Sequence, residues 1–69
     1  MTPLKKKRIS MGMKQCELAV KAGNISISNF SRYENGWARP SHDTASRIAT
    51  VLKCEISEIF PELEGNSDD

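Results

Sequence analysis

The segment at residues 25–36 constrains the fold of this chain more than any other part of the sequence. It reads ISISNFSRYENG, follows Gly23, and has the spacing of the second of two short helices joined by a turn. At about 100° of rotation per residue, Phe30 marks the side that faces the core. The opposite side carries Ser28, Arg32 and Asn35. Because these are short neutral hydrogen-bonding groups around one arginine, the segment predicts a helix-turn-helix whose outer face suits base edges in a DNA major groove.

The rest of the sequence predicts four more short helices, and therefore an all-α, five-helix fold. Capping residues, glycines and prolines place the helices at about residues 3–11, 15–22, 27–35, 41–52 and 55–60. The first helix has a thin apolar stripe of Leu4, Ile9 and Met11. Since Pro61 follows the last helix, residues 1–60 are expected to form one domain. Residues 61–69 are polar and acidic and are expected to form a disordered tail.

Charge is divided unevenly along the chain. Residues 1–54 carry all ten lysines and arginines against three acids, a net charge of +7, whereas residues 55–69 carry six acids and no base. A basic body with an acidic end suits a protein that binds a polyanion such as DNA or RNA. The other interpretation is an ordinary solvated surface with an acidic end.

Several other functions are not indicated. The single histidine, His42, belongs to no recognisable catalytic motif, so we expect no enzyme activity. One histidine and two distant cysteines, Cys16 and Cys54, offer no zinc ligand set, and we expect no metal, cofactor or small-molecule ligand. Both cysteines occupy apolar-patterned positions and are expected to be buried thiols. Since no apolar run follows the basic N-terminal residues, we expect a soluble, cytoplasmic protein without membrane attachment.

Three blocks of sequence together resemble the Cro/CI-type (XRE-like) helix-turn-helix family. They are RIxMGMxQxELA at residues 8–19, SRYENG at residues 31–36 and RPS at residues 39–41. The family includes lambdoid phage repressors and Cro proteins, restriction-modification controller proteins and many antitoxins. The resemblance covers residues 4–60. It implies a lambda-repressor-like domain that binds a double-stranded DNA operator as a homodimer, with the third helix in the major groove.

The sequence departs from the family pattern at two positions. Asn24 is an extra residue in the turn after Gly23, and Ile27 stands where relatives commonly have Gln or Arg as the first base-reading residue. Ile27 therefore has two interpretations. It completes the edge of the core, or it meets the methyl group of a thymine.

Helical phase and the resemblance together give a set of candidate DNA contacts. Arg32 and Ser28 lie one turn apart on the outer line and are expected to reach bases, with a phosphate contact as the alternative for Arg32. Gln15 stands where family members hold a phosphate; otherwise it is a polar residue that begins a helix. Trp37 flanks a loop where relatives use backbone N–H groups against phosphate, or it covers the core. The full set is Gln15, Ile27, Ser28, Asn29, Ser31, Arg32, Asn35 and Arg39.

Two further roles are implied by the resemblance alone. Arg8 and Glu34 match an ion pair that joins the first helix to the end of the third. Relatives dimerise around residues that correspond here to Lys53, Cys54, Glu55 and Ile56. Since no second domain is evident, we expect a homodimer through this small surface, weak until DNA places two half-sites together.

The leading hypothesis is a sequence-specific transcriptional regulator, a repressor of a phage, mobile element or bacterial chromosome. An antitoxin or a restriction-modification controller would use the same residues on its own operator. The alternative from another class is a protein-interaction module. The outer face of residues 27–35 argues against it, because such a module would carry more exposed aromatic side chains.

Overall fold

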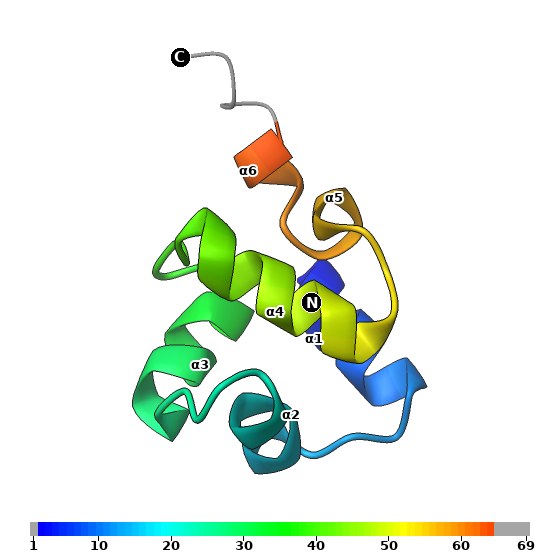
Figure 1. Cartoon of the computed structure of the whole chain (residues 1–69), viewed down its shortest axis with the longest axis vertical. Coiled ribbons are helices and arrows are strands. Elements are labelled where there is room, and N and C mark those ends of the chain that lie inside the picture. The colour runs from blue at the N-terminus through cyan, green and yellow to red at the C-terminus, as the bar shows by residue number, and fades with distance from the viewer. Residues whose placement is uncertain (1, 65–69) are drawn as a thin grey trace.

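The computed structural model describes residues 2–64; residues 1 and 65–69 lie outside the described part. No strand occurs within residues 2–64, and the prediction of an all-α fold is confirmed. None of the described helices is both long and apolar enough to cross a membrane. The helices are α1 (Pro3–Ser10), α2 (Gln15–Lys21), α3 (Ile27–Asn35), α4 (His42–Leu52), α5 (Ile56–Ile59) and α6 (Pro61–Glu64) (Figure 1).

Local sequence signals set the helix ends. The hydroxyl groups of Thr2, Ser26 and Ser41 each accept a hydrogen bond from the backbone N–H three residues later, at 3.3, 3.2 and 3.2 Å. Each cap satisfies an N–H group that the first turn of a helix leaves without a partner. Gly36 ends α3 in the left-handed conformation, with a φ of 77°. As a result, the bounds of α1–α5 lie within one residue of the predicted ones.

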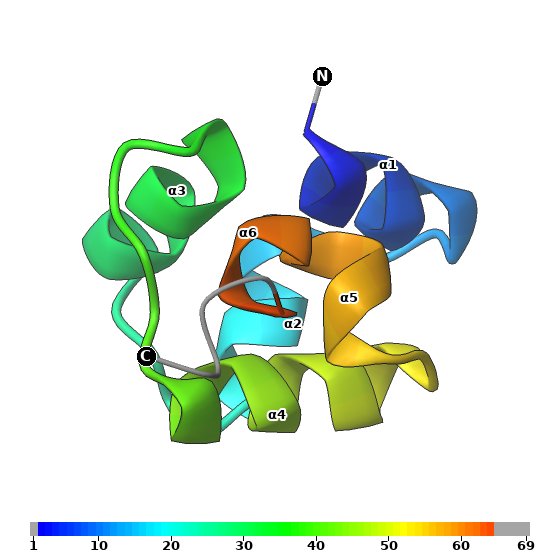
Figure 2. The same cartoon turned by 90° about the horizontal axis from the view of Figure 1, so that it is seen from above.

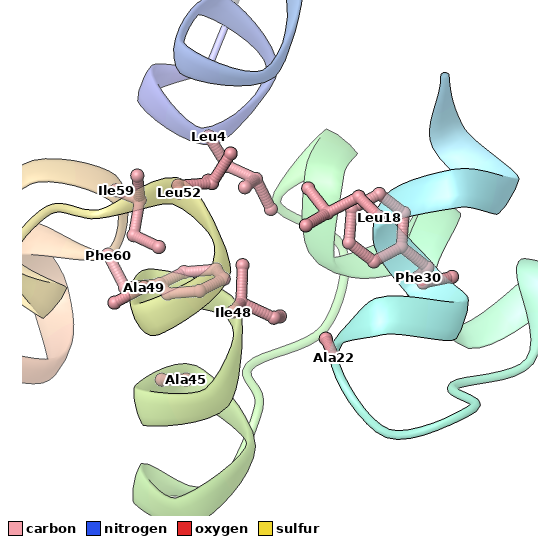
Figure 3. Close-up of a cluster of buried hydrophobic side chains, with 11 residues drawn as sticks. Leu4, Leu18, Ala22, Phe30, Ala45, Ile48, Ala49, Leu52, Ile59 and Phe60 are labelled. Carbon is pink, nitrogen blue, oxygen red and sulfur yellow. The ribbon is translucent and has the colours of Figure 1, made fainter. Parts of the chain in front are cut away.

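One apolar core holds the helices together, and it is formed mainly by α1, α2, α4 and the α5 region (Figure 3). From α3, Phe30 reaches this core and is fully buried. Burial of one such side chain is worth about 1.5–3 kcal/mol, so Phe30 is the main apolar anchor of α3. The buried apolar residues are Leu4, Leu18, Ala19, Ala22, Phe30, Ala45, Ile48, Ala49, Leu52, Ile59 and Phe60.

The arrangement of the helices leaves one side of α3 open. α3 packs against α2 and α1, while α4 packs against α2 and α5. Figure 2 shows α3 at one side of the molecule and α5 at the other, with α4 running between the two sides. The outer face of α3 and the expected dimer surface before α5 therefore lie on different sides of the domain.

Two expectations about burial are wrong. Ile9 and Met11 are exposed, because α1 meets the core through Leu4 and not along a continuous stripe. Cys16 is also exposed. It lies about 200° from Leu18 by helical phase, so the turn of α2 that buries Leu18 directs Cys16 to solvent.

The short helix α6 lies in a stretch that the sequence assigned to the disordered tail. Pro61 begins this helix, a position that suits proline because the first turn needs no N–H donor. Leu63 packs, partly buried, against the core. Helical structure therefore continues past residue 60 to Glu64, and residues 65–69 of the expected tail lie outside the described residues.

Candidate nucleic-acid interface

The turn between α2 and α3 has a left-handed backbone at two successive residues, one of which is the Asn24 that the resemblance marks as extra. Gly23 and Asn24 have φ values of 110° and 58°. Asparagine is one of the few residues besides glycine that adopts this conformation readily. The N–H of Ile25 then donates to the carbonyl of Ala19 at 3.0 Å, and the Ile25 side chain packs against the core. The turn therefore fixes the direction in which α3 leaves α2.

Three polar side chains on the outer face of α3 are exposed and have no bonding partners among the described side chains. Ser28, Asn29 and Arg32 are exposed, and none of their side chains makes a hydrogen bond or an ion pair with the side chains that the structure describes, which exclude those of residues 62 and 64. This face carries hydroxyl, amide and guanidinium groups, which are the groups that pair with base edges. Ser28 and Arg32 are thus exposed on the side of α3 that helical phase predicted, and Asn29 is exposed beside them.

Ile27, the first residue of α3, is exposed and does not lie in the core. Its side chain is 48% exposed, and it belongs neither to the buried cluster nor to the apolar residues packed against it. The interpretation that Ile27 completes the core is therefore wrong. Ile25 takes that place, which sequence reasoning missed because the orientation of a turn residue depends on the left-handed backbone of Asn24.

Asn35 and Ser31 are bonded to each other. The Asn35 amide nitrogen donates to the backbone carbonyl of Ser31 at 2.9 Å and to its hydroxyl oxygen at 3.3 Å. Ser31 is half-buried, while Asn35 is exposed at the end of α3. The two side chains therefore support the last turn of α3, and the amide oxygen of Asn35 and part of the bonding capacity of the Ser31 hydroxyl remain free.

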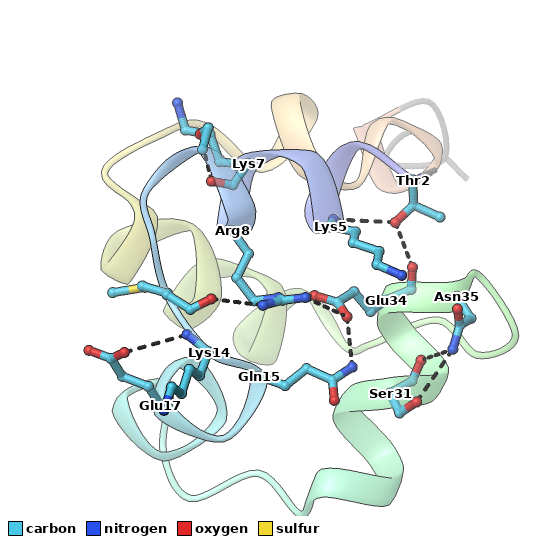
Figure 4. A network of polar contacts seen from close by, with 12 residues as sticks. Thr2, Lys5, Lys7, Arg8, Lys14, Gln15, Glu17, Ser31, Glu34 and Asn35 are labelled. Atoms are coloured by element: carbon cyan, nitrogen blue, oxygen red, sulfur yellow. Dashed lines mark hydrogen bonds and ion pairs between the residues drawn. The ribbon is translucent and has the colours of Figure 1, made fainter.

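The buried carboxylate of Glu34 joins α3 to α1 and α2 (Figure 4). Glu34 is 2% exposed, and its carboxylate accepts hydrogen bonds from the guanidinium group of Arg8 and from the amide nitrogen of Gln15, the latter at 2.7 Å. Arg8 also donates to the carbonyl of Met13 at 2.7 Å, and the hydroxyl of Thr2 donates to the backbone carbonyl of Glu34. The structure thus brings Arg8 and Glu34 together and adds Gln15 to the pair.

The position of Gln15 follows from this network. Because a carboxylate only accepts hydrogen bonds, the Gln15 nitrogen must face Glu34. An amide nitrogen has two N–H groups, so Gln15 keeps a second donor after it binds Glu34. Gln15, which was expected at a phosphate, is therefore held in place by Glu34, 19 positions away. No local pattern of the sequence predicts this contact.

The connection between α3 and α4 carries two exposed side chains, Trp37 and Arg39. Trp37 is 78% exposed, so the interpretation that it covers the core is wrong. The N–H groups of Gly36, Trp37 and Ala38 donate to carbonyls of Tyr33 and Arg32, at 3.2, 2.9 and 3.3 Å. These backbone donors are already used within the loop, so here they are not available to a phosphate in the manner expected from relatives.

Arginine and lysine side chains differ in whether an acid neutralises them. Lys21 pairs with Glu17 at 3.5 Å and Arg47 with Asp43 at 3.2 Å. Arg32 and Arg39 form no ion pair with any acid in the part of the chain that the structure describes. The two uncompensated arginines thus flank the end of α3, one on the helix and one on the loop after it.

The four residues expected at a dimer surface form the link from α4 to α5. Lys53 ends α4 with a φ of 56° and is exposed, as is Glu55, which precedes α5. Cys54 and Ile56 are half-buried and pack against the core. Burial raises the pKa of the Cys54 thiol, the nearby carboxylates of Glu58 and Glu55 raise it further, and Lys7 opposes them.

Comparison with known proteins defines the class. The helix-turn-helix family model matches residues 4–59, which is most of the chain. The chain therefore belongs to the XRE family of helix-turn-helix proteins, as in Cro and CI. It is a sequence-specific DNA-binding regulator, a class whose domains are not typically catalytic. Comparison with curated proteins and with solved structures finds no match.

Proposed function

We propose that this protein is a transcriptional repressor that binds a palindromic operator as a homodimer, with α3 in the major groove. The observation that carries the proposal is the exposed outer face of α3, where Ser28, Asn29 and Arg32 have no partner among the described side chains. In the free protein these groups bond to water, and base edges in a major groove can take the place of that water.

Base reading falls to two side chains on the outer line of α3. The guanidinium group of Arg32 forks onto O6 and N7 of a guanine, a contact worth about 1–3 kcal/mol of discrimination. Ser28, one turn earlier, contacts the neighbouring base, and Ile27 meets a thymine methyl group beside it. Asn29 lies at the edge of this face and reaches the flanking base or its phosphate.

Backbone contacts hold the domain in register. Gln15 donates a hydrogen bond from its second amide N–H to one phosphate, and the guanidinium group of Arg39 pairs with another. Near the end of α3, the free polar atoms of Asn35 and Ser31 make further contacts with the DNA backbone. These contacts carry no sequence information, but they release counterions, so we expect binding to weaken steeply with salt. The net charge of +7 over residues 1–54 supports the same expectation.

Dimerisation uses the link from α4 to α5, at Lys53, Cys54, Glu55 and Ile56. Two exposed charged side chains of opposite sign, beside two half-buried apolar ones, can pair with a symmetric copy of themselves. A surface this small gives weak dimers in solution, and a palindromic site strengthens them by placing two half-sites together. Action on a genomic operator in the cytoplasm is part of the same proposal.

Random-site selection with the purified protein tests the proposal. We expect a pseudo-palindromic consensus with half-sites about 34 Å apart, one turn of DNA, and two chains per site. The matched control is the triple variant with Ser28, Asn29 and Arg32 changed to alanine. It should melt at the wild-type temperature, because these side chains are exposed and make no internal bonds, yet select no sequence.

Selection has two outcomes that count against the proposal. If no sequence is enriched, the protein is better explained as a protein-interaction module. If the selected site is a single half-site bound by one chain, the proposed homodimer is wrong. The sense of regulation needs a reporter gene with the selected site placed over its promoter. Lower expression on adding the protein supports a repressor, and higher expression contradicts it.

A further inference from the structure

The most exposed large apolar side chain in the described part of the molecule lies directly after the recognition helix. Trp37 is 78% exposed, more than Ile9, Met11, Val20 or Ile27. Its backbone is nevertheless fixed, since its N–H donates to the carbonyl of Arg32 at 2.9 Å. The indole therefore projects to solvent from a braced loop and not from a loose one.

The surroundings of Trp37 match those of a polyanion contact. Gly36, Trp37, Ala38 and Arg39 line one hollow of the surface, with a volume of about 450 Å³. No acidic residue occurs between Asn35 and His42. Arg39 has no ion pair in the described chain, so its positive charge at this hollow is uncompensated. An apolar ring beside an unpaired cation suits the alternating sugar and phosphate of a DNA strand.

The backbone of the loop leaves few donors for a DNA strand. The three N–H groups of residues 36–38 donate to carbonyls at the end of α3, so they do not reach a phosphate. The exposed side chains of Trp37 and Arg39 are the larger groups that this loop presents to a strand. The carbonyl of Arg32 accepts two of these N–H groups, those of Trp37 and Ala38. The loop therefore lies next to the surface of α3 that is proposed to face the groove.

We infer that Trp37 is a DNA-backbone contact: its indole packs on a deoxyribose at the edge of the major groove, and Arg39 holds the adjoining phosphate in the hollow. The inference rests on the proposed function, since it needs α3 to lie in the groove. An indole packs against any sugar regardless of the base. Trp37 therefore adds affinity without adding sequence preference.

Salt dependence separates this contact from an ionic one. The slope of log affinity against log salt concentration counts the phosphates that cations neutralise, at about 0.9 for each. Trp37 carries no charge, so Trp37→Ala should lower affinity about tenfold through lost apolar burial and leave the slope unchanged. Arg39→Ala should lower affinity and also make the slope shallower by about 0.9. Trp37→Phe, which keeps an aromatic ring, should recover most of the affinity.

The experiment titrates the four proteins, wild type and three variants, on the selected DNA site at several salt concentrations. Equal affinity of wild type and Trp37→Ala overturns the inference, as does a changed consensus for Trp37→Ala. Failure of the wild type to bind DNA at all is a different result, because it removes the proposed function first. Melting curves show whether Trp37→Ala keeps the fold, as its exposure predicts.

Fluorescence gives a readout that needs no variant, because Trp37 is the only tryptophan of the chain. In free protein, acrylamide should quench its emission strongly. Addition of the selected duplex should protect it, and a duplex of unrelated sequence should do so only at low salt. Protection in concentrated protein without DNA would assign Trp37 to a contact with a second copy and overturn the inference.

Discussion

The amide nitrogen of Gln15 lies 2.7 Å from a carboxylate oxygen of Glu34, and this bond links the start of α2 to the end of α3. The same carboxylate is paired with Arg8 of α1. Glu34 thus orients a residue proposed to hold DNA while it closes a structural ion pair. Variants can separate the two proposed roles, because Arg8 is expected to support folding and Gln15 to bind DNA.

Glu34→Ala should destabilise the domain by about 3–5 kcal/mol, because it leaves the guanidinium of Arg8 without its partner in a largely buried place. The side chain of Arg8 is only 12% exposed. Urea unfolding measures the change. Asp43→Ala is the matched control: Asp43 also pairs with an arginine, Arg47, but both side chains are more than half exposed, and its loss should cost less than about 1 kcal/mol. An equal loss in the free energy of unfolding for the two variants would show that the buried ion pair stabilises the domain no more than an exposed one.

Gln15→Ala should lower affinity for the selected site about ten- to a hundredfold, since a hydrogen bond to a charged group is worth about 1.5–3 kcal/mol. The selected sequence should not change, because a phosphate contact reads no base. Titration of wild type and variant on one duplex, with repeated site selection, checks both points. Unchanged affinity together with a lower melting temperature would show that Gln15 serves only to brace Glu34.

Gly23→Ala should destabilise the helix-turn-helix, chiefly because the φ of 110° strains any residue with a side chain. A Cβ atom at Gly23 would also lie 2.9 Å from a guanidinium nitrogen of Arg47, but this exposed side chain can move aside. Gly12→Ala is the control, since its φ is also positive but nothing lies within 4 Å of its Cβ. Gly12→Ala should cost only about 1–2 kcal/mol, the ordinary penalty of a left-handed residue.

A double variant identifies the cause of the Gly23 effect. If the clash contributes, Arg47→Ala should restore part of the stability that Gly23→Ala loses. Thermal melts of the single and double variants measure the coupling. Full additivity of the two changes would assign the whole effect to the backbone conformation.

The sequence predicts the helices of this domain well because their signals are local. Ser26 and Ser41 cap the helices that follow them, and Gly36 ends α3, so residues close in sequence decide each boundary. Arg8 and Glu34 are 26 positions apart, and only the family resemblance pointed to their pairing. Local signals therefore define the elements, while the contacts between elements need either a relative or the structure.

The errors arise where three-dimensional context decides. Ile25, and not Ile27, packs against the core, because the left-handed Asn24 sets the direction of the turn. The hydrogen bond from Gln15 to Glu34 joins two residues of different helices, 19 positions apart, so the helical periodicity of neither helix predicts it. Trp37 is exposed although a tryptophan in a small domain is usually well buried. Each of these differences falls on or beside the proposed DNA-binding surface.

Arg32 is the side chain whose replacement should change sequence preference most. It is the only charged residue on the exposed face of α3, and no acid in the described part of the chain pairs with it. Arg32→Ala should therefore relax selection at one base pair in each half-site and leave the other positions intact. Forked bonding to a guanine gives about 1–3 kcal/mol of discrimination, whereas a phosphate contact gives affinity alone.

Arg32→Lys sharpens the test, because lysine keeps the positive charge and loses the planar fork. If Arg32 reads a guanine, the lysine variant should keep the salt slope of the wild type but show weaker preference at the same base pair. If Arg32 binds only phosphate, lysine should restore nearly all of the affinity, and the consensus should be the same for all three proteins. In that case Ser28 and Ile27 must carry the sequence reading, since both are exposed at the start of α3, and Asn29 beside them is expected to contribute less.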